Sequence, residues 1–262
     1  MKNYERPIVV FDSGLGGISV LKKLIEVMPN ESFIYYGDSA NAPYGPRTSQ
    51  DVCRLTVEGV AHMDTLRPKA IVIACNTATA AALETLERRY PHIPVTGIEP
   101  AVRRAVQDNP NGRILSLATA GTLASASYRQ QLREVSEYGT VISAAAPGIV
   151  DYIERGARDR EWVIRYLREL LAPWQSISFD GVVLGCTHFP FAVSEIQEAL
   201  GYKVRFYESS EATAQKTQSR LIEQGTINTE AGHSGITFMN SANDKMMLSR
   251  SWKLFAMALN SI

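Results

Sequence analysis

Residues 71–77 have the sequence IVIACNT, and residues 182–188 have the similar sequence VVLGCTH. In each stretch a short apolar run ends in a cysteine, Cys75 or Cys186, which small polar residues follow. Short continuous apolar runs are typical of strands in a parallel sheet that helices cover on both faces. The repeat therefore predicts two related halves, each with a cysteine at the carboxyl end of a buried strand.

The same alternation of apolar runs and helical stretches extends through most of the chain. A long helical stretch at 148–171, with Gly156 as a candidate break, is one of the helices that separate the strands. This pattern predicts an α/β fold with two pseudo-symmetric, doubly wound domains, mostly parallel sheets and an active-site cleft between them. Right-handed crossovers would place the carboxyl ends of the strands on one rim of each sheet. The predicted strands are 8–11, 33–36, 70–74, 95–98, 113–117, 141–145, 181–184, 204–207 and 236–239.

The composition argues against several classes of partner. Lys plus Arg and Asp plus Glu both number 27, so the formal net charge is zero and nothing global favours nucleic acid or an anionic membrane. No apolar run is long enough to cross a bilayer, and the polar start of the chain is unlike a secretory signal. Three cysteines without a CxxC pair favour neither a disulfide framework nor a zinc site. We therefore expect a cytoplasmic protein with reduced thiols.

Cys75 and Cys186 are candidate acid–base groups. A buried structural cysteine behaves as a small hydrophobe, and that explanation would serve for either one alone. Matching positions in a repeat favour function for the pair, whereas Cys53, within a predicted helix and without polar neighbours, is expected to be a core residue. A thiol, with an unperturbed pKa of about 8.5, supplies either the acid or the base near neutral pH after modest tuning. Two opposed thiols suit a racemase, in which one removes an α-proton and the other returns one from the opposite face.

Other polar residues lie at the predicted rims. Asp12-Ser13-Gly14 is either a helix cap, or it places Asp12 beside a thiol and lets Ser13 and backbone N–H groups hold a carboxylate. His188 is either a structural hydrogen-bonding residue or a thiolate partner and proton relay for Cys186. Asp38 and Glu154 are ambiguous, because carboxylates are common at surfaces. The other candidates for holding a small zwitterion are Tyr44, Gly45, Asn76, Thr77, Thr119, Thr122 and Thr187.

No feature of the sequence predicts a cofactor. Gly14-Leu15-Gly16-Gly17 lacks the full spacing of a dinucleotide-binding loop and the acidic residue after the second strand. No cluster of residues has the spacing of a metal site. We therefore expect a cofactor-independent enzyme with no metal.

Five blocks of sequence occur between residue 8 and about residue 215: FDSGLGG at 11–17, YGD at 36–38, PYG at 43–45, ACNTA at 74–78 and LGCTHFP at 184–190. In sequence and in order they resemble the signature blocks of bacterial glutamate racemases, of the aspartate/glutamate racemase superfamily. The resemblance implies two α/β domains, residues 1–98 completed by residues 208–262, and residues 99–207. It also implies interconversion of L- and D-glutamate without pyridoxal phosphate or metal, a homodimer, and supply of D-glutamate for peptidoglycan, hence for cell-wall biogenesis and cell shape.

The resemblance also implies roles for individual residues. Cys75 and Cys186 would be the two bases, acting on the D- and L-isomers respectively. Asp12 would assist Cys75, and His188 would assist Cys186. Asp38 and Glu154 match acids near the family's site. The substrate would be held by Asp12, Ser13, Tyr44, Gly45, Asn76, Thr77, Thr187 and His188.

Two departures from the family's pattern leave the subgroup open. Glu208-Ser209-Ser210 replaces a common Asp-Ser pair, and Ala144-Ala145-Ala146-Pro147 replaces a segment that often carries a cysteine. Three alternatives also stay open. A superfamily relative would act on aspartate, since one methylene is worth only about 1–3 kcal/mol of discrimination. A catalytically silent protein on the same fold would bind an amino acid without exchanging its α-proton. A cysteine hydrolase built on Cys186 and His188 would leave Cys75 unexplained.

Overall fold

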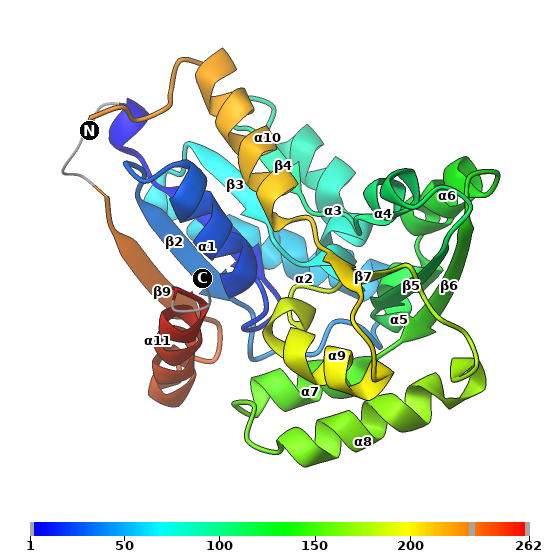
Figure 1. The fold of residues 1–262 in the computed structure, drawn as a ribbon. Helices are drawn as coiled ribbons and strands as arrows, with labels where there is room; N and C mark the ends of the chain where they lie inside the picture. Colours follow the sequence, from blue (N-terminus) through cyan, green and yellow to red (C-terminus); the bar gives the residue numbers. More distant parts are fainter. Residues whose placement is uncertain (1–2, 231–233, 260–262) are drawn as a thin grey trace.

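The computed structural model of the protein describes residues 3–230 and 234–259, and its strands form two sheets (Figure 1). The first sheet has the order β4-β3-β1-β2-β9 and the second has the order β6-β5-β7-β8. All neighbouring strands in both sheets are parallel, which confirms the predicted α/β class. The strands are β1 (Ile8–Asp12), β2 (Phe33–Gly37), β3 (Ala70–Ile73), β4 (Val95–Gly97), β5 (Arg113–Ala118), β6 (Thr140–Ala145), β7 (Gly181–Gly185), β8 (Arg205–Tyr207) and β9 (Ile236–Asn240).

The two sheets repeat one strand order. The spatial order β4-β3-β1-β2 of the first sheet matches β8-β7-β5-β6 of the second, so β1 is equivalent to β5 and β3 to β7. The direction in which the chain adds strands reverses between β1 and β3 in the first sheet and between β5 and β7 in the second. Ligands of open parallel sheets bind at such a reversal, beyond the carboxyl ends of the strands. Cys75 follows β3 and Cys186 follows β7, so the repeat places the two cysteines at equivalent switch points.

Helices pack on both faces of the first sheet. Along β1, Ile8 and Val10 belong to one apolar cluster, and Val9 and Phe11 belong to another. Because both faces are buried, the strand is apolar from Ile8 to Phe11. The helices are α1 (Ile18–Val27), α2 (Ser49–His62), α3 (Asn76–Arg89), α4 (Val102–Asp108), α5 (Ala120–Ala124), α6 (Ala126–Val135), α7 (Pro147–Glu154), α8 (Arg160–Leu171), α9 (Val193–Leu200), α10 (Ser210–Glu223) and α11 (Lys245–Leu259). Short 3-10 turns are η1 (Asn3–Glu5), η2 (Met63–Leu66), η3 (Ala172–Trp174) and η4 (Phe189–Ala192).

The helical stretch predicted at 148–171 is interrupted as its glycine suggested. Helix α7 ends at Glu154 and α8 begins at Arg160. Between them Gly156 has φ of 88° and Ala157 has φ of 54°, a left-handed conformation that glycine adopts without a steric penalty. Just before this break, Glu154 at the end of α7 contacts Leu15 in the glycine-rich loop that follows β1.

The C-terminal segment returns to the first sheet (Figure 1). Strand β9 pairs in parallel with β2, and the aromatic rings of Phe238, Trp252 and Phe255 pack together where α11 crosses β9. No helix in the described part of the chain is both long and apolar enough to cross a membrane.

Candidate active site

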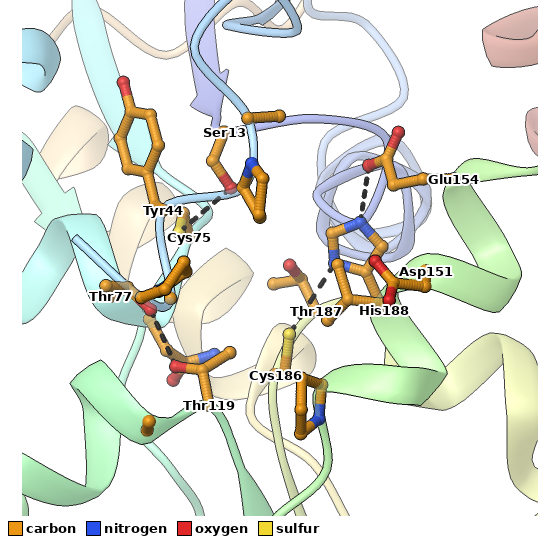
Figure 2. A pocket seen from close by; sticks show the side chains of 18 residues that line it. Ser13, Tyr44, Cys75, Thr77, Thr119, Asp151, Glu154, Cys186, Thr187 and His188 are labelled. Carbon is orange, nitrogen blue, oxygen red and sulfur yellow. Dashed lines mark hydrogen bonds and ion pairs between the residues drawn. The ribbon is translucent and has the colours of Figure 1, made fainter. Parts of the chain in front are cut away.

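A cavity of about 420 Å³ lies between the carboxyl-end loops of the two sheets (Figure 2). Figure 2 shows Ser13, Tyr44, Cys75, Thr77 and Thr119 on one side of it, and Asp151, Glu154, Cys186, Thr187 and His188 on the other. Among the described residues of its lining none is a lysine or an arginine. The complete lining is Ser13, Ala42, Pro43, Tyr44, Gly45, Pro46, Cys75, Asn76, Thr77, Thr119, Ala120, Pro147, Val150, Asp151, Glu154, Cys186, Thr187 and His188.

Cys75 lies at the junction between β3 and α3. It is the N-cap of α3, and its Sγ accepts a hydrogen bond from the N–H of Ala78 at 3.5 Å. The hydroxyl of Ser13 donates to the same sulfur at 3.4 Å. Both contacts favour a thiolate, but burial and the negative charge of Asp12 outweigh them and raise the pKa of Cys75 to about 12. In the free protein Cys75 is therefore a thiol, ready to give a proton.

Asp12 ends β1 and is fully buried. Its carboxylate accepts the N–H of Gly14 at 2.8 Å and the hydroxyl of Thr187 at 3.3 Å, so it links the first sheet to the loop that carries Cys186. Burial raises the pKa of Asp12, although His188 and the Gly14 N–H act in the opposite direction. Asp12 does not line the cavity; it acts on Cys75 through its charge, which favours the protonated thiol.

Cys186 has a different set of neighbours. Its Sγ lies 3.6 Å from Nδ1 of His188, and Nε2 of the same ring lies 2.7 Å from Oε1 of Glu154 (Figure 2). Burial lowers the pKa of His188, but the contacts with Cys186 and Glu154 outweigh it and raise the pKa well above its usual value. The raised pKa favours an imidazolium at His188, with Nδ1 placed to donate to the sulfur of Cys186, and a cation so placed favours a thiolate. No α-helix begins directly after Cys186, because the turn η4 comes before α9.

Cys186, His188 and Glu154 form a relay of contacts, and the glycine-rich loop after β1 packs against it. The N–H of Leu15 donates to Oε1 of Glu154 at 2.8 Å, the same oxygen that His188 contacts. A Cβ at Gly14 would collide with the carboxylate of Glu154, and one at Gly16 would collide with His188. The glycines of this loop thus allow it to approach the residues that surround Cys186, which explains the motif without a phosphate ligand.

Uncharged groups line the wall beside Cys75. Hydroxyls of Thr77, Thr119 and Thr122 form a hydrogen-bonded group, with 2.8 Å between the Oγ1 atoms of Thr77 and Thr119. Oδ1 of Asn76 is buried without a hydrogen-bond partner, and this residue lines the cavity. A buried acceptor without a partner is costly. The side chain of Asn76 is therefore available for a donor on a bound molecule, such as an ammonium group.

Hydrogen bonds to Asp38 and Gly121 hold the loop that carries Tyr44 and Gly45. The hydroxyl of Tyr44 donates to Oδ2 of Asp38 at 2.5 Å, and Asn41 donates to both oxygens of the same carboxylate. The carbonyl of Gly45 accepts the N–H of Gly121 at the start of α5. Asp38 is thus buried behind the cavity lining and anchors the loop that forms one wall of the cavity.

Most of the residues predicted from the sequence meet at this cavity. Eleven of the fourteen line it: Ser13, Tyr44, Gly45, Cys75, Asn76, Thr77, Thr119, Glu154, Cys186, Thr187 and His188. Asp12, Asp38 and Thr122 lie behind it and contact lining residues. Cys53 is distant from it, within α2, where it packs with apolar residues of the second cluster.

Three lining residues of α7 were not among the candidates: Pro147, Val150 and Asp151. Val150 and Asp151 lie four and three positions before Glu154, respectively, a spacing that puts helical residues on one face. That spacing from Glu154 was the one signal that could have identified them.

Comparison with known proteins agrees with this geometry. Residues 9–217 match the family described as Asp/Glu/hydantoin racemase. The glutamate racemase of Clostridium perfringens strain 13 is 41% identical over 248 residues, which cover 95% of each chain. The chain belongs to the Asp/Glu/hydantoin racemase family. The resemblance found in the sequence is thereby confirmed.

Solved structures of racemases have the same fold. Glutamate racemase isoform RacE1 from Bacillus anthracis has a TM-score of 0.83 at 32% identity, with 97% of this chain and 94% of that chain covered. Glutamate racemase from Francisella tularensis, in complex with D-glutamate, has a TM-score of 0.82 at 28% identity and the same coverage. The predicted arrangement of parallel sheets in two groups is thus shared with racemases of the family.

Proposed function

We propose that this protein interconverts L-glutamate and D-glutamate by proton transfer between the substrate α-carbon and two thiols. The observation that carries the proposal is that Cys75 and Cys186, each 7% exposed, reach one cavity from equivalent strands of two sheets. A racemase needs an acid and a base on opposite faces of one carbon, and this arrangement supplies them. The enzyme class and glutamate as substrate follow from the matched family and from relatives named glutamate racemase along nearly their whole length.

The charges around the two thiols favour one direction of proton transfer. A His188 imidazolium beside Cys186 favours a thiolate there, whereas the raised pKa of Cys75 keeps that residue a thiol. Cys186 removes the α-proton, the electron pair is delocalised into the substrate carboxylate, and the Cys75 S–H bond breaks to protonate the opposite face. The products are the other enantiomer, a Cys186 thiol and a Cys75 thiolate. If Cys186 acts on the L-isomer, the free form accepts L-glutamate, and the proton distribution must be reversed before the next turnover.

Neutral hydrogen-bond donors and one cationic side chain of the cavity lining are available to bind the substrate. His188 is the cationic side chain of the lining, and the hydroxyls of Ser13, Thr77, Thr119 and Thr187 are the donors available for the substrate carboxylates. Backbone N–H groups at the start of α3 contribute the positive end of the helix dipole. Donors oriented in advance toward a carboxylate stabilise the charge that develops on it when the α-proton leaves.

The wider role is also proposed. D-Glutamate made in this way supplies peptidoglycan synthesis, and with it cell-wall biogenesis and cell shape, in the cytoplasm. A homodimer and a division into residues 1–98 with 208–262 and residues 99–207 complete the proposal. The division is supported by the two sheets and by the pairing of β9 with β2.

The test is α-proton exchange in heavy water. Purified protein with a thiol reductant and L-glutamate, without added cofactor, should lose optical activity while deuterium enters the α-position, as followed by circular dichroism and proton NMR. L-Aspartate should show neither change. Racemisation of aspartate instead would keep the two-thiol chemistry and change the substrate, whereas folded protein with titratable thiols and no exchange on either would refute the proposal.

A further inference from the structure

We propose that Arg250 of helix α11 is a positioning residue for the relay that serves Cys186, because it holds the end of α7 that carries Glu154. Nη1 of Arg250 donates to the backbone carbonyl of Glu154 at 3.0 Å. This inference rests on the proposed proton transfer at Cys186. It adds a residue from the far end of the chain to the machinery of that thiol.

The end of α7 requires such a contact. The last four carbonyls of an α-helix have no partner within the helix. In α7 the carbonyls of Asp151, Tyr152 and Ile153 accept the N–H groups of the turn that follows, at residues 155–157. The fourth, that of Glu154, accepts the guanidinium of Arg250. Arg250 therefore fixes the backbone of the residue whose side chain holds His188.

The charge of Arg250 acts on the side chain as well. Burial raises the pKa of Glu154, but His188, the Leu15 N–H and the positive charge of Arg250 outweigh burial and lower it. A carboxylate that stays ionised beside Nε2 keeps His188 protonated, and the imidazolium in turn faces Cys186. Loss of the guanidinium should therefore make Glu154 less readily ionised. His188 would then be less readily protonated, and the thiolate of Cys186 would be less favoured.

The contact also crosses between the two sheets. Helix α11 packs on β9 and α1, on the side of the first sheet, whereas α7 follows β6 of the second. Leu15, which holds the other end of the same glutamate, also comes from the first sheet. Besides His188, the two groups that contact Glu154 from outside its own helix thus belong to the side of the opposite sheet. The relay of Cys186 is complete only while the two sheets are in contact.

The experiment measures the pH dependence of Cys186 alkylation in the full-length protein. Iodoacetamide is the probe, and mass spectrometry of peptides distinguishes Cys186 from Cys75. Besides His188, the titratable or charged groups around Cys186 are Glu154, Asp12, Cys75, Asp151 and Arg250. In R250M, alkylation of Cys186 at neutral pH should slow about threefold, the size of effect that one partly exposed charge produces, and its pH profile should move upward.

Matched variants separate this role from a general loss of structure. K253M removes a cation from an exposed position of the same helix and should leave both the alkylation profile and the racemase rate unchanged. R250K keeps the charge and should restore most of the wild-type profile, while Cys75 alkylation should stay the same in all variants. If R250M does not fold, R250Q, which keeps a donor but no charge, should shift the profile in the same direction.

Three results would overturn the proposal. One is an R250M profile that coincides with that of K253M. Another is equal acceleration of alkylation at both thiols, which would indicate local unfolding, and the third is an unshifted profile in R250Q. Because alkylation needs no turnover, absence of α-proton exchange in the wild type would refute the proposed function without deciding the role of Arg250.

Discussion

Cys75 and Cys186 occupy equivalent positions in two sheets of the same strand order, yet their surroundings differ in charge. Cys75 has a hydroxyl, a helix N-terminus and the nearby negative charge of Asp12, and its pKa is raised to about 12. Cys186 has an imidazolium that a carboxylate holds in place. Repetition of the fold thus places two thiols symmetrically, while residues that differ between the two halves, such as Asp12 and His188, surround them with different charges. A two-base enzyme with one substrate site needs that asymmetry, because one thiol must be ionised when the other is not.

The largest expected effect comes from removing either thiol. C75A and C186A should each lose racemisation by about a thousandfold or more, the contribution of a general acid or base. Each variant should keep slow α-proton exchange with one enantiomer only. C75A should exchange the α-proton of L-glutamate, and C186A should exchange that of D-glutamate. Proton NMR in heavy water measures both. C53A is the control and should be fully active, and exchange of both isomers by either single variant would contradict the assignment of one thiol to each enantiomer.

Removal of the cation beside Cys186 should have the next largest effect. H188N should reduce racemisation about a hundredfold. The raised pKa keeps the imidazolium protonated below and somewhat above neutrality, so the wild-type thiol should react with iodoacetamide in that range and the H188N thiol should not. H92N, at an exposed position, is the matched control. Unchanged Cys186 reactivity in H188N would remove the basis for the asymmetry between the two thiols.

A smaller effect is expected when His188 is displaced rather than removed. In G16A the new methyl group would collide with the His188 ring and the Thr187 hydroxyl, so the ring must move away from Cys186. Racemisation should fall about thirtyfold, since a misplacement of about 1 Å at a catalytic group costs up to a hundredfold. The control is G235A, where a methyl group meets nothing within 4 Å. Steady-state rates and thermal melts of both variants measure the effect, and a G16A enzyme as active as G235A would show that the loop yields without moving the histidine.

The smallest expected effect concerns the charge of Asp12 beside Cys75. D12N removes the negative charge that contributes to the raised pKa of Cys75, so the pKa should fall and the thiolate should form at lower pH. Alkylation of Cys75 at pH 9 should accelerate about fivefold, which corresponds to somewhat less than one pKa unit. D38N removes a buried carboxylate that holds Tyr44 and should leave Cys75 unaffected. Equal effects of D12N and D38N would mean that the charge of Asp12 is not what sets Cys75 apart.

The sequence predicted the features that depend on local patterns. Apolar runs that end at Cys75 and Cys186 are local, and so are the glycine break after α7 and the polar residues at strand ends. Parallel topology then determines where those ends meet, so most predicted site residues did line one cavity. The period of the apolar pattern and the right-handedness of the crossovers are enough to bring these residues to one edge of each sheet.

Contacts between distant segments could not be predicted in this way. Glu154 lies 34 positions from the histidine that it holds, and Arg250 lies 96 positions from Glu154. Neither pair shares a motif, because each depends on how α7 and α11 pack across the two sheets. The placement of Asp12 also depends on packing, since its burial and its hydrogen bond to Thr187 put it behind the cavity. Charge at such a site depends on packing, which no local pattern encodes.

The pairing of β9 with β2 also determines when the molecule becomes complete during its synthesis. Every strand of the second sheet leaves the ribosome before β9, so that sheet can form while the outer edge of β2 still has no strand partner. An unpaired strand edge is a template for pairing with another chain. Residues 236–259 close that edge and deliver Arg250 to the end of α7 in the same late step. A chain whose translation stops before this segment would therefore be prone to aggregate and would lack the Arg250 contact with the end of α7.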